Sequence, residues 1–141
     1  MAVRVHWDGR EIPGPCSAGP LRRETAVLEI RDGLLAPWLL QPTPELSRFP
    51  ALTLERPLSA DPSFLDWAGL VAPLPTGPTP EPPGFRKAVT LEYAAALGPV
   101  RFRLEAAWPS GYEVLDAFDG PARERLTLVH EGFARLDAGE P

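Results

Sequence analysis

The stretch RKAVTLEYAAALGPVRFRLEA, residues 86–106, decides the fold because it contains two alternating runs on either side of a turn. The apolar members are Val89, Leu91 and Tyr93 in the first run and Val100, Phe102 and Leu104 in the second. A period of two is typical of a strand with one buried face. We therefore predict an antiparallel β-hairpin over this stretch.

The register of this hairpin is constrained by parity, because a slip of one residue would turn both core faces to solvent. Pairing Leu91 with Leu104 keeps both core faces together and leaves residues 96–99 as a four-residue loop. The same pairing sets Glu92 opposite Arg103, and an attractive cross-strand pair contributes roughly 0.2–1 kcal/mol. We predict this register.

Similar strand patterns flank the hairpin. Residues 3–7 alternate and end in a DG turn at 8–9, after which REIP gives a brief return strand and PGPCSAGP reads as a turn cluster. Further strands are predicted over 24–31, over 52–57 and from 124 onward, whereas WPSGYEVLDAFDG (108–120) reads as a loop with a possible short strand. We expect a mainly β fold of about seven strands, an antiparallel sandwich or barrel.

One helix is predicted after the strand that ends near Pro57. Asp61 suits the N-cap and Pro62 the first helical position, and the helix should run to about Leu70. Its apolar positions follow helical spacing and fall on one side: Phe64, Trp67, Ala68 and Val71. We expect this helix to flank the sheet.

Length and composition limit the alternatives. The 141 residues suit a single domain, 1–141, and the 19 prolines favour long loops at about 33–48 and 71–85. A net charge of −5 counts against direct nucleic-acid specificity. A single cysteine excludes an internal disulfide, the N-terminus does not resemble a signal peptide, and LLAPWLL (34–40) is too short to span a bilayer. We expect cytoplasmic synthesis and no membrane insertion.

The reactive residue types do not form a recognisable catalytic or metal-binding pattern. Cys16 could pair with His6 or His130 as an activated nucleophile, but GPCSAG is not a nucleophile motif, so a small residue in a turn is the better interpretation. Neither histidine has a second ligand at metal spacing. We predict no catalytic, cofactor-binding or metal site, and no enzymatic activity.

An apolar segment follows the strand over 24–31. Leu34, Leu35, Trp38 and Leu39 could fold over the core, or they could form an exposed patch of the kind that marks a subunit contact. We take these four residues as the candidate subunit contact.

The order of motifs resembles the tail tube proteins of contractile phages and phage-like contractile injection systems. The resemblance rests on a set of motifs that covers most of the chain: VRVHWDGREI, CSAG, ETAVLEIRDG, FPALTLERPLSADPSFLDWA, RKAVTLEY, FRLEAAWPSGY and ERLTLVHEGF. The set departs from the family at Pro20, where family members tend to have leucine, and in the segment GLLAPWLL, which is more hydrophobic than the usual loop at this position.

The resemblance implies a structural protein that assembles as a hexameric ring, with rings stacked into a tube around a lumen. Its expected partners are further copies of itself, sheath and baseplate proteins and possible lumen cargo, within a phage tail or an injection particle. The apolar strand faces are needed for the core. The polar faces are therefore candidates for the lumen: Thr90, Glu92, Arg101, Arg103 and Glu105.

Two alternatives remain open. The departures from the family pattern favour a specialised ring, such as the tube initiator on the baseplate. In a different class, a monomeric β-sandwich module could recognise a peptide through the proline-rich loop at 73–83 or through residues 34–40.

Overall fold

The computed structural model describes residues 2–28, 43–70, 83–116 and 119–137. In chain order the described elements are β1 (Ala2–Trp7), β2 (Arg10–Ala18), β3 (Glu24–Leu28), β4 (Thr43–Arg48), β5 (Leu52–Pro57), α1 (Ser63–Gly69), β6 (Lys87–Tyr93), β7 (Val100–Leu115), β8 (Arg123–Val129) and β9 (Phe133–Leu136). The predicted mainly β fold with one helix is confirmed. No helix among the described residues is long and apolar enough to cross a membrane.

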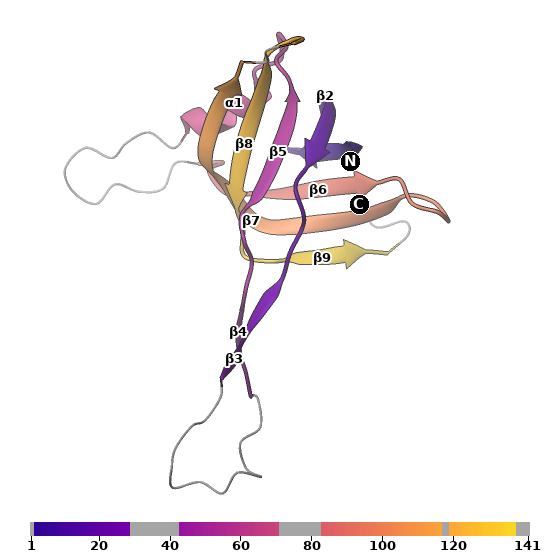
Figure 1. Cartoon of the computed structure of the whole chain (residues 1–141), viewed down its shortest axis with the longest axis vertical. Helices are drawn as coiled ribbons and strands as arrows, with labels where there is room; N and C mark the ends of the chain where they lie inside the picture. Colours follow the sequence, from indigo (N-terminus) through magenta and orange to yellow (C-terminus); the bar gives the residue numbers. More distant parts are fainter. Residues whose placement is uncertain (1, 29–42, 71–82, 117–118, 138–141) are drawn as a thin grey trace, which may run out of the picture.

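Six of the strands close into an antiparallel barrel. The large sheet has the order β6-β1-β2-β5-β8-β7-β9, and an additional pairing of β6 with β7 closes it (Figure 1). The 16-residue strand β7 makes this possible, because its first half pairs with β6 and β9 and its second half pairs with β8. Closure pairs the edges that an open sheet would expose.

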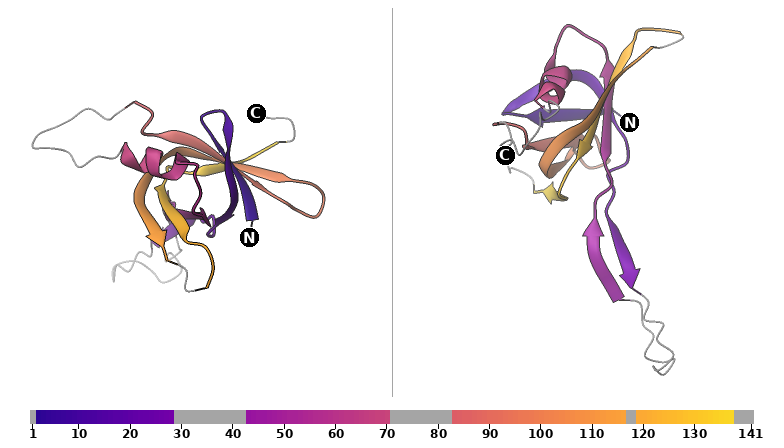
Figure 2. Two further views of the ribbon diagram at one scale, coloured as in Figure 1. Left: turned by 90° about the horizontal axis from the view of Figure 1, so that it is seen from above. Right: turned by 90° about the vertical axis from the view of Figure 1, so that its left-hand side faces the viewer.

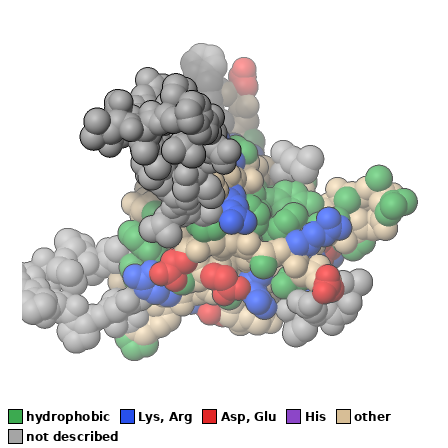
Figure 3. Space-filling model, turned by 90° about the horizontal axis from the view of Figure 1, so that it is seen from below, with side chains coloured by type: hydrophobic (Ala, Val, Ile, Leu, Met, Phe, Trp, Pro, Cys, Tyr) green, Lys and Arg blue, Asp and Glu red, His purple; other side chains and the backbone are tan. Residues whose placement is uncertain are grey.

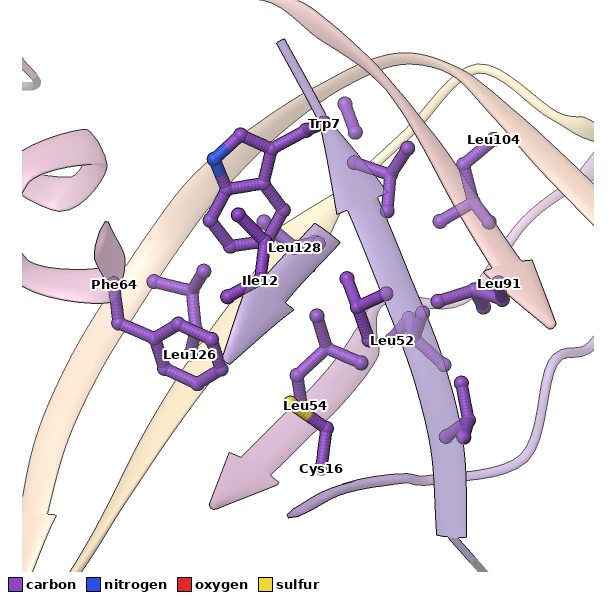
Figure 4. Close-up of a cluster of buried hydrophobic side chains, with 14 of the residues drawn as sticks. Trp7, Ile12, Cys16, Leu52, Leu54, Phe64, Leu91, Leu104, Leu126 and Leu128 are labelled. Atoms are coloured by element: carbon purple, nitrogen blue, oxygen red, sulfur yellow. The ribbon is translucent and has the colours of Figure 1, made fainter. Parts of the chain in front are cut away.

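The core lies inside the barrel, where alternate residues of each strand point inward. The valines and leucines exposed by 1% or less are Val5, Leu52, Leu54, Val89, Leu91, Leu104, Leu126 and Leu128. Figure 4 shows side chains of β1, β5, β6, β7 and β8 converging. Each fully buried side chain of this kind contributes roughly 1.5–3 kcal/mol, so the period-two pattern read from the sequence supplies most of the stabilising burial.

Helix α1 covers one end of the barrel, away from the β3–β4 pair (Figures 1 and 2). Its Phe64 and Trp67 are buried against Trp7, with ring centroids 5.9 Å and 4.8 Å from the Trp7 ring. Trp67 also donates a hydrogen bond through Nε1 to the Phe85 carbonyl at 2.8 Å. The expected flanking helix therefore caps the core with its aromatic rings.

The helix begins at Ser63, later than predicted, and its N-cap is Pro62 in place of Asp61. The Asp61 carboxylate and carbonyl both accept hydrogen bonds from Arg56, at 3.0 Å and 2.8 Å, which holds Asp61 outside the helix. The carboxylate still accepts from the Ser63 amide at 3.2 Å. Asp61 therefore bonds the first turn of the helix as predicted, but it does so from the position before the N-cap.

Strands β3 and β4 pair only with each other among the described strands and project from the barrel as a two-stranded ribbon (Figures 1 and 2). The prediction of a loop over 33–48 was wrong for Thr43–Arg48, which form β4. The prolines at 42 and 44 suggested a loop, but a strand with an unpaired edge tolerates a residue that cannot donate. The predicted loop residues at 33–42 and 71–82 lie outside the described residues.

The predicted hairpin is confirmed, but its register was wrong by two residues. Leu91 pairs with Phe102 and Glu92 with Arg101, so the connection comprises Ala94–Pro99. The turn decides this register: Gly98 has a φ of 119° and its amide donates to Ala95 at 3.2 Å. A shift of two preserves parity, so the core faces are unchanged.

Two segments predicted to be loops or turns continue as strands. Residues 13–18 belong to β2, where Val3 pairs with Cys16 and Val5 with Ile12, leaving the prolines in a bulge. Residues 108–115 belong to β7, whose register shifts between Pro109 and Gly111. A bulge residue need not donate to the ladder, so proline is accommodated there.

Candidate assembly surfaces

The predicted lumen residues share one outward face of the barrel. In the strand register Thr90 lies opposite Arg103 and Glu92 opposite Arg101, while Glu105 follows on the same side of β7. Their neighbours Val89, Leu91 and Leu104 point into the core. Strand alternation thus brings all five predicted residues onto the surface we call the mixed-charge face: Arg4, His6, Glu11, Thr90, Glu92, Arg101, Arg103 and Glu105.

Strands β1 and β2 extend this face with residues that sequence reasoning did not include. Arg4 lies opposite Glu92 and is 3.4 Å from it, while its Nε is 2.6 Å from Glu11. His6 lies opposite Thr90. The alternation of residues 3–7 already turned Arg4 and His6 outward, but only the pairing of β1 with β6 shows that they join the same face.

Opposite charges are paired along the mixed-charge face. Arg103 Nε is 2.7 Å from Glu105. The hydrogen bond from Arg4 lowers the pKa of Glu11, and the same bond raises the pKa of Arg4. Exposed pairs of this kind add little to stability because the solvent screens their charges. Their effect is instead to leave a polar wall with no large field of one sign.

A second charged surface covers the outer sides of β5, β8 and the end of β7. Arg125 contacts Glu55 at 3.4 Å and Glu113 at 3.3 Å, and Arg123 lies 3.8 Å from Glu55. Elsewhere, on the face of the molecule seen from below, acidic and basic side chains likewise lie close together next to apolar ones (Figure 3). The barrel therefore presents mixed charge on two separate faces.

A buried ion cluster lies beneath the helix. Arg56 is 1% exposed and donates to the Pro13 carbonyl at 2.7 Å, to Asp61 and, at 3.2 Å, to Glu124, which is 2% exposed. The Arg56 guanidinium also lies 4.3 Å from the centre of the Phe64 ring. Arg56 and Glu124 are enclosed, whereas the Asp61 side chain is partly exposed, and the contacts of Arg56 join β2, β5, β8 and α1.

The residues considered for catalysis are separated in the structure. Cys16, predicted to lie in a turn, points into the core from β2, and burial raises the pKa of its thiol. His6 lies on the mixed-charge face, and His130 lies between Phe49 and Phe133 in the turn after β8. Among the described residues, no three histidine, cysteine or acidic side chains gather as metal ligands.

The candidate subunit contact of Leu34, Leu35, Trp38 and Leu39 lies outside the described residues. These residues fall in the segment that connects the two ribbon strands, between Leu28 and Thr43. At the base of the ribbon, an apolar groove of about 380 Å³ is lined by Leu21, Tyr93, Phe102 and Phe133 with neighbouring small residues.

Comparison with known structures identifies the fold. No protein-family model matches the sequence, and no curated protein matches it significantly. A chain in the structure of the anti-feeding prophage cap, the tube-terminating cap, is 18% identical with a TM-score of 0.73, covering 97% of this chain and 89% of that one.

Two other solved structures agree. A chain of the PVC sheath/tube terminator, from an extracellular contractile injection system in the extended state, is 16% identical with a TM-score of 0.73, covering 96% of this chain and 94% of that one. Hcp1 from Flavobacterium johnsoniae is 10% identical with a TM-score of 0.57, covering 96% and 94%. The resemblance seen in the sequence is confirmed at the level of fold: the chain has the fold of proteins that occur in the tube assemblies of contractile injection systems.

Proposed function

We propose that the chain is a structural, non-enzymatic subunit of the inner tube of a contractile phage tail or phage-like injection system. One observation carries the proposal: barrel, capping helix and ribbon together match chains of contractile tube assemblies over 96–97% of the sequence. The whole chain is therefore accounted for by the shared fold. The described residues also offer no cluster of metal-ligating side chains that would argue for chemistry.

Six copies would close into a ring. A matching chain comes from a baseplate structure described as six-fold symmetrised. In this protein the barrel closes within the chain, and β9 ends the seven-stranded sheet with one edge that no other described strand pairs. An open strand edge is a template for pairing with another chain. We propose that β9 and the ribbon supply contacts between copies, with Leu34, Leu35, Trp38 and Leu39 as an apolar contact.

The mixed-charge face would line the lumen. Its charges are paired and interspersed, as with Arg103 and Glu105 or Arg4 and Glu11. A wall of this kind stays hydrated and offers a passing cargo neither an apolar patch nor a strong single-sign field. Sheath and baseplate proteins would then contact the outside of the ring, and the assembled particle would be the protein's site of action.

A specialised ring is the second candidate, because one structural match is to a chain of a baseplate and another is to a terminating cap. Both roles use the same fold. They differ in whether rings of this chain stack upon each other, which electron microscopy of the purified protein distinguishes: long tubes indicate the repeating subunit, and single rings indicate a terminal or initiating one.

The test combines microscopy with labelling. Six-fold rings or tubes are expected in electron micrographs of concentrated protein or of protein co-expressed with its sheath and baseplate proteins. Only monomers under those conditions would contradict the proposal and favour a peptide-binding module. After assembly, the introduced thiol of Arg103→Cys should not react with a bulky maleimide, because it would face the lumen.

Glu113→Cys is the matched control, since Glu113 lies on the same strand but on the second charged surface, with a side chain exposed by 56%. In rings assembled from the purified protein without sheath or baseplate proteins, it should label equally before and after assembly. Native Cys16 is buried and contributes little background. Protection of Glu113→Cys with free labelling of Arg103→Cys would reverse the assignment of the lumen face while leaving the ring intact.

A further inference from the structure

Phe49 lies at the junction between the ribbon and the barrel. It directly follows β4, and its ring packs against His130 and Phe133, with centroid distances of 5.7 Å and 5.8 Å. Since β3 and β4 pair only with each other among the described strands, the ribbon is held at its two connections to the barrel. The connection from β2 is fixed by Gly19, whose amide donates to Thr53 at 2.8 Å. Phe49 anchors the other.

The Phe49 ring packs against the turn between β8 and β9, residues 130–132, which we call the seat of Phe49. Gly132 has a φ of 140°, and a Cβ built on it would stand 3.2 Å from the Phe49 ring. The ring therefore lies directly against the backbone. Two hydrogen bonds of 2.9 Å, from the Glu105 amide to Gly132 and from the Glu131 amide to Glu105, fix this turn to β7. A change in the turn is thus transmitted to Phe49.

The neutral form of His130 stabilises this turn. The imidazole is 5% exposed, and its Nδ1 accepts a hydrogen bond from the Gly132 amide at 3.2 Å. Nδ1 is therefore unprotonated and the proton resides on Nε2, which makes no hydrogen bond of good geometry among the described residues. The backbones of Gly132 and Pro50 raise the pKa of the ring, but burial outweighs them. Protonation would place a second N–H at Nδ1, facing the Gly132 amide, and would bury a charge between two aromatic rings.

The neighbouring elements offer no compensating charge among their described residues. The charged side chains closest in the chain to the contacts of His130 are Glu131 in the turn, Glu105 on β7, Arg48 on β4 and Arg135 on β9. All four are exposed; Glu105 pairs with Arg103, and Arg48 lies 3.7 Å from Glu24. Burial lowers the pKa of His130 below its usual 6.5.

We propose that protonation of His130 opens the seat of Phe49 and loosens the ribbon from the barrel, so that acid releases one of the ribbon's two attachments. The direction of the pH effect follows from the coupling between protonation of His130 and opening of the turn. The closed state favours neutral His130, so its contribution is complete above pH 6.5 and is lost as the pH falls toward the lower pKa of the closed state. Between pH 6.5 and the pKa of His130 in the closed state, the equilibrium constant for opening should increase by up to about tenfold for each unit by which the pH falls.

Amide hydrogen exchange of the unassembled full chain tests this, with rates corrected for the intrinsic effect of pH. From about pH 7.5 to about pH 5, segments 49–52 and 130–134 should open increasingly, while the β6 core segment 89–91 stays protected. His130→Asn should abolish the increase, because its side-chain oxygen can still accept from Gly132 but cannot be protonated. His6→Asn, which alters the other histidine of the chain, should leave the increase unchanged.

Two outcomes would overturn the proposal: an equal increase in His130→Asn, or a rise at 89–91 that parallels the rise at 130–134, which would mean global unfolding. If His130→Asn fails to fold, NMR titration of the wild-type chain decides. The Gly132 amide shift and the His130 ring must then titrate together below pH 6.5, and separate midpoints would refute the mechanism. The test does not require a ring, so it is independent of the proposed function.

Discussion

At the scale of single residues, Arg56 is the most deeply buried charged side chain among the described residues. It is buried yet occupies the inward face of β5, in line with Leu52 and Leu54. It is tolerated there because its Nη1 and Nη2 groups donate to Pro13, Asp61 and Glu124, although its Nε has no partner among the described residues. A buried charge with several hydrogen bonds is retained as a unit, and losing one partner exposes the others to the full cost of burial.

Replacing Arg56 with methionine should lower the free energy of unfolding by about 3–5 kcal/mol, because Glu124 would remain buried without its partner. Urea unfolding measures the loss. Arg125→Met is the matched control: that arginine also lies between two acids, but its side chain is 34% exposed. Its loss should cost no more than about 1 kcal/mol. Equal costs for the two variants would contradict the role given to Arg56.

At the scale of elements, α1 shows how a short helix is stabilised by tertiary contacts. Seven residues are too few for an independent helix. The element persists because Phe64 and Trp67 fill the end of the barrel and because Asp61 bonds the first turn. The helix and the barrel core therefore form one cooperative unit.

Phe64→Ala should destabilise the protein by about 3–5 kcal/mol, since a fully buried ring leaves a cavity at the end of the barrel. Leu65→Ala in the same helix removes a side chain that is 53% exposed. It should change the free energy of unfolding by about 0.5 kcal/mol or less. Thermal or urea denaturation of the pair measures the contrast, and a similar cost for both would show that α1 does not cap the core.

Acid should weaken the start of α1. The pKa of Asp61 is lowered from 3.8, first by the hydrogen bond from the Ser63 side chain and then by Arg56. Its contribution is therefore complete above pH 3.8 and is lost as the pH falls through the lower folded-state pKa. In Asp61→Asn, the free energy of unfolding should therefore fall less steeply with decreasing pH in this range. Asp66→Asn, at an exposed position of the same helix, should preserve it; identical curves for wild type and Asp61→Asn would refute the linkage.

At the scale of the whole molecule, a closed barrel leaves few strand edges for uncontrolled pairing. Six strands pair with one another in the barrel, while β9 and each ribbon strand keep one edge that no other described strand pairs. The two outer faces carry paired charges, and the core is entirely internal. Assembly contacts in the proposed ring are therefore separate from the contacts that fold the subunit.

This separation predicts that Leu35→Ser combined with Trp38→Ser abolishes ring or tube formation and leaves the subunit folded. Electron microscopy and light scattering follow assembly, while circular dichroism and urea unfolding follow the fold. Leu58→Ser, at a position that is 45% exposed and outside the proposed contact, should leave both unchanged. Normal tubes from the double variant would exclude residues 34–39 as the subunit contact.

The parity of the strands was predictable from the sequence, and so was much of the candidate lumen face. Alternation placed Val89, Leu91 and Leu104 inside and turned Thr90 and Arg103 outward, as the structure has them. Arg4 and Glu11 were not predicted to belong to this face, because membership depends on β1 lying beside β6. That pairing joins residues almost ninety positions apart and has no local signal.

The sequence by itself determined which apolar side chains of β1, β5, β6, β8 and α1 face inward, because a period of two and a helical spacing are local properties of the backbone. Only the tertiary structure decided the hairpin register, the passage of β2 and β7 through their prolines, and the burial of Arg56. These depend on partners: a missing proline N–H matters only where a neighbouring strand needs it, and a buried arginine is stable only where acceptors from distant segments meet it.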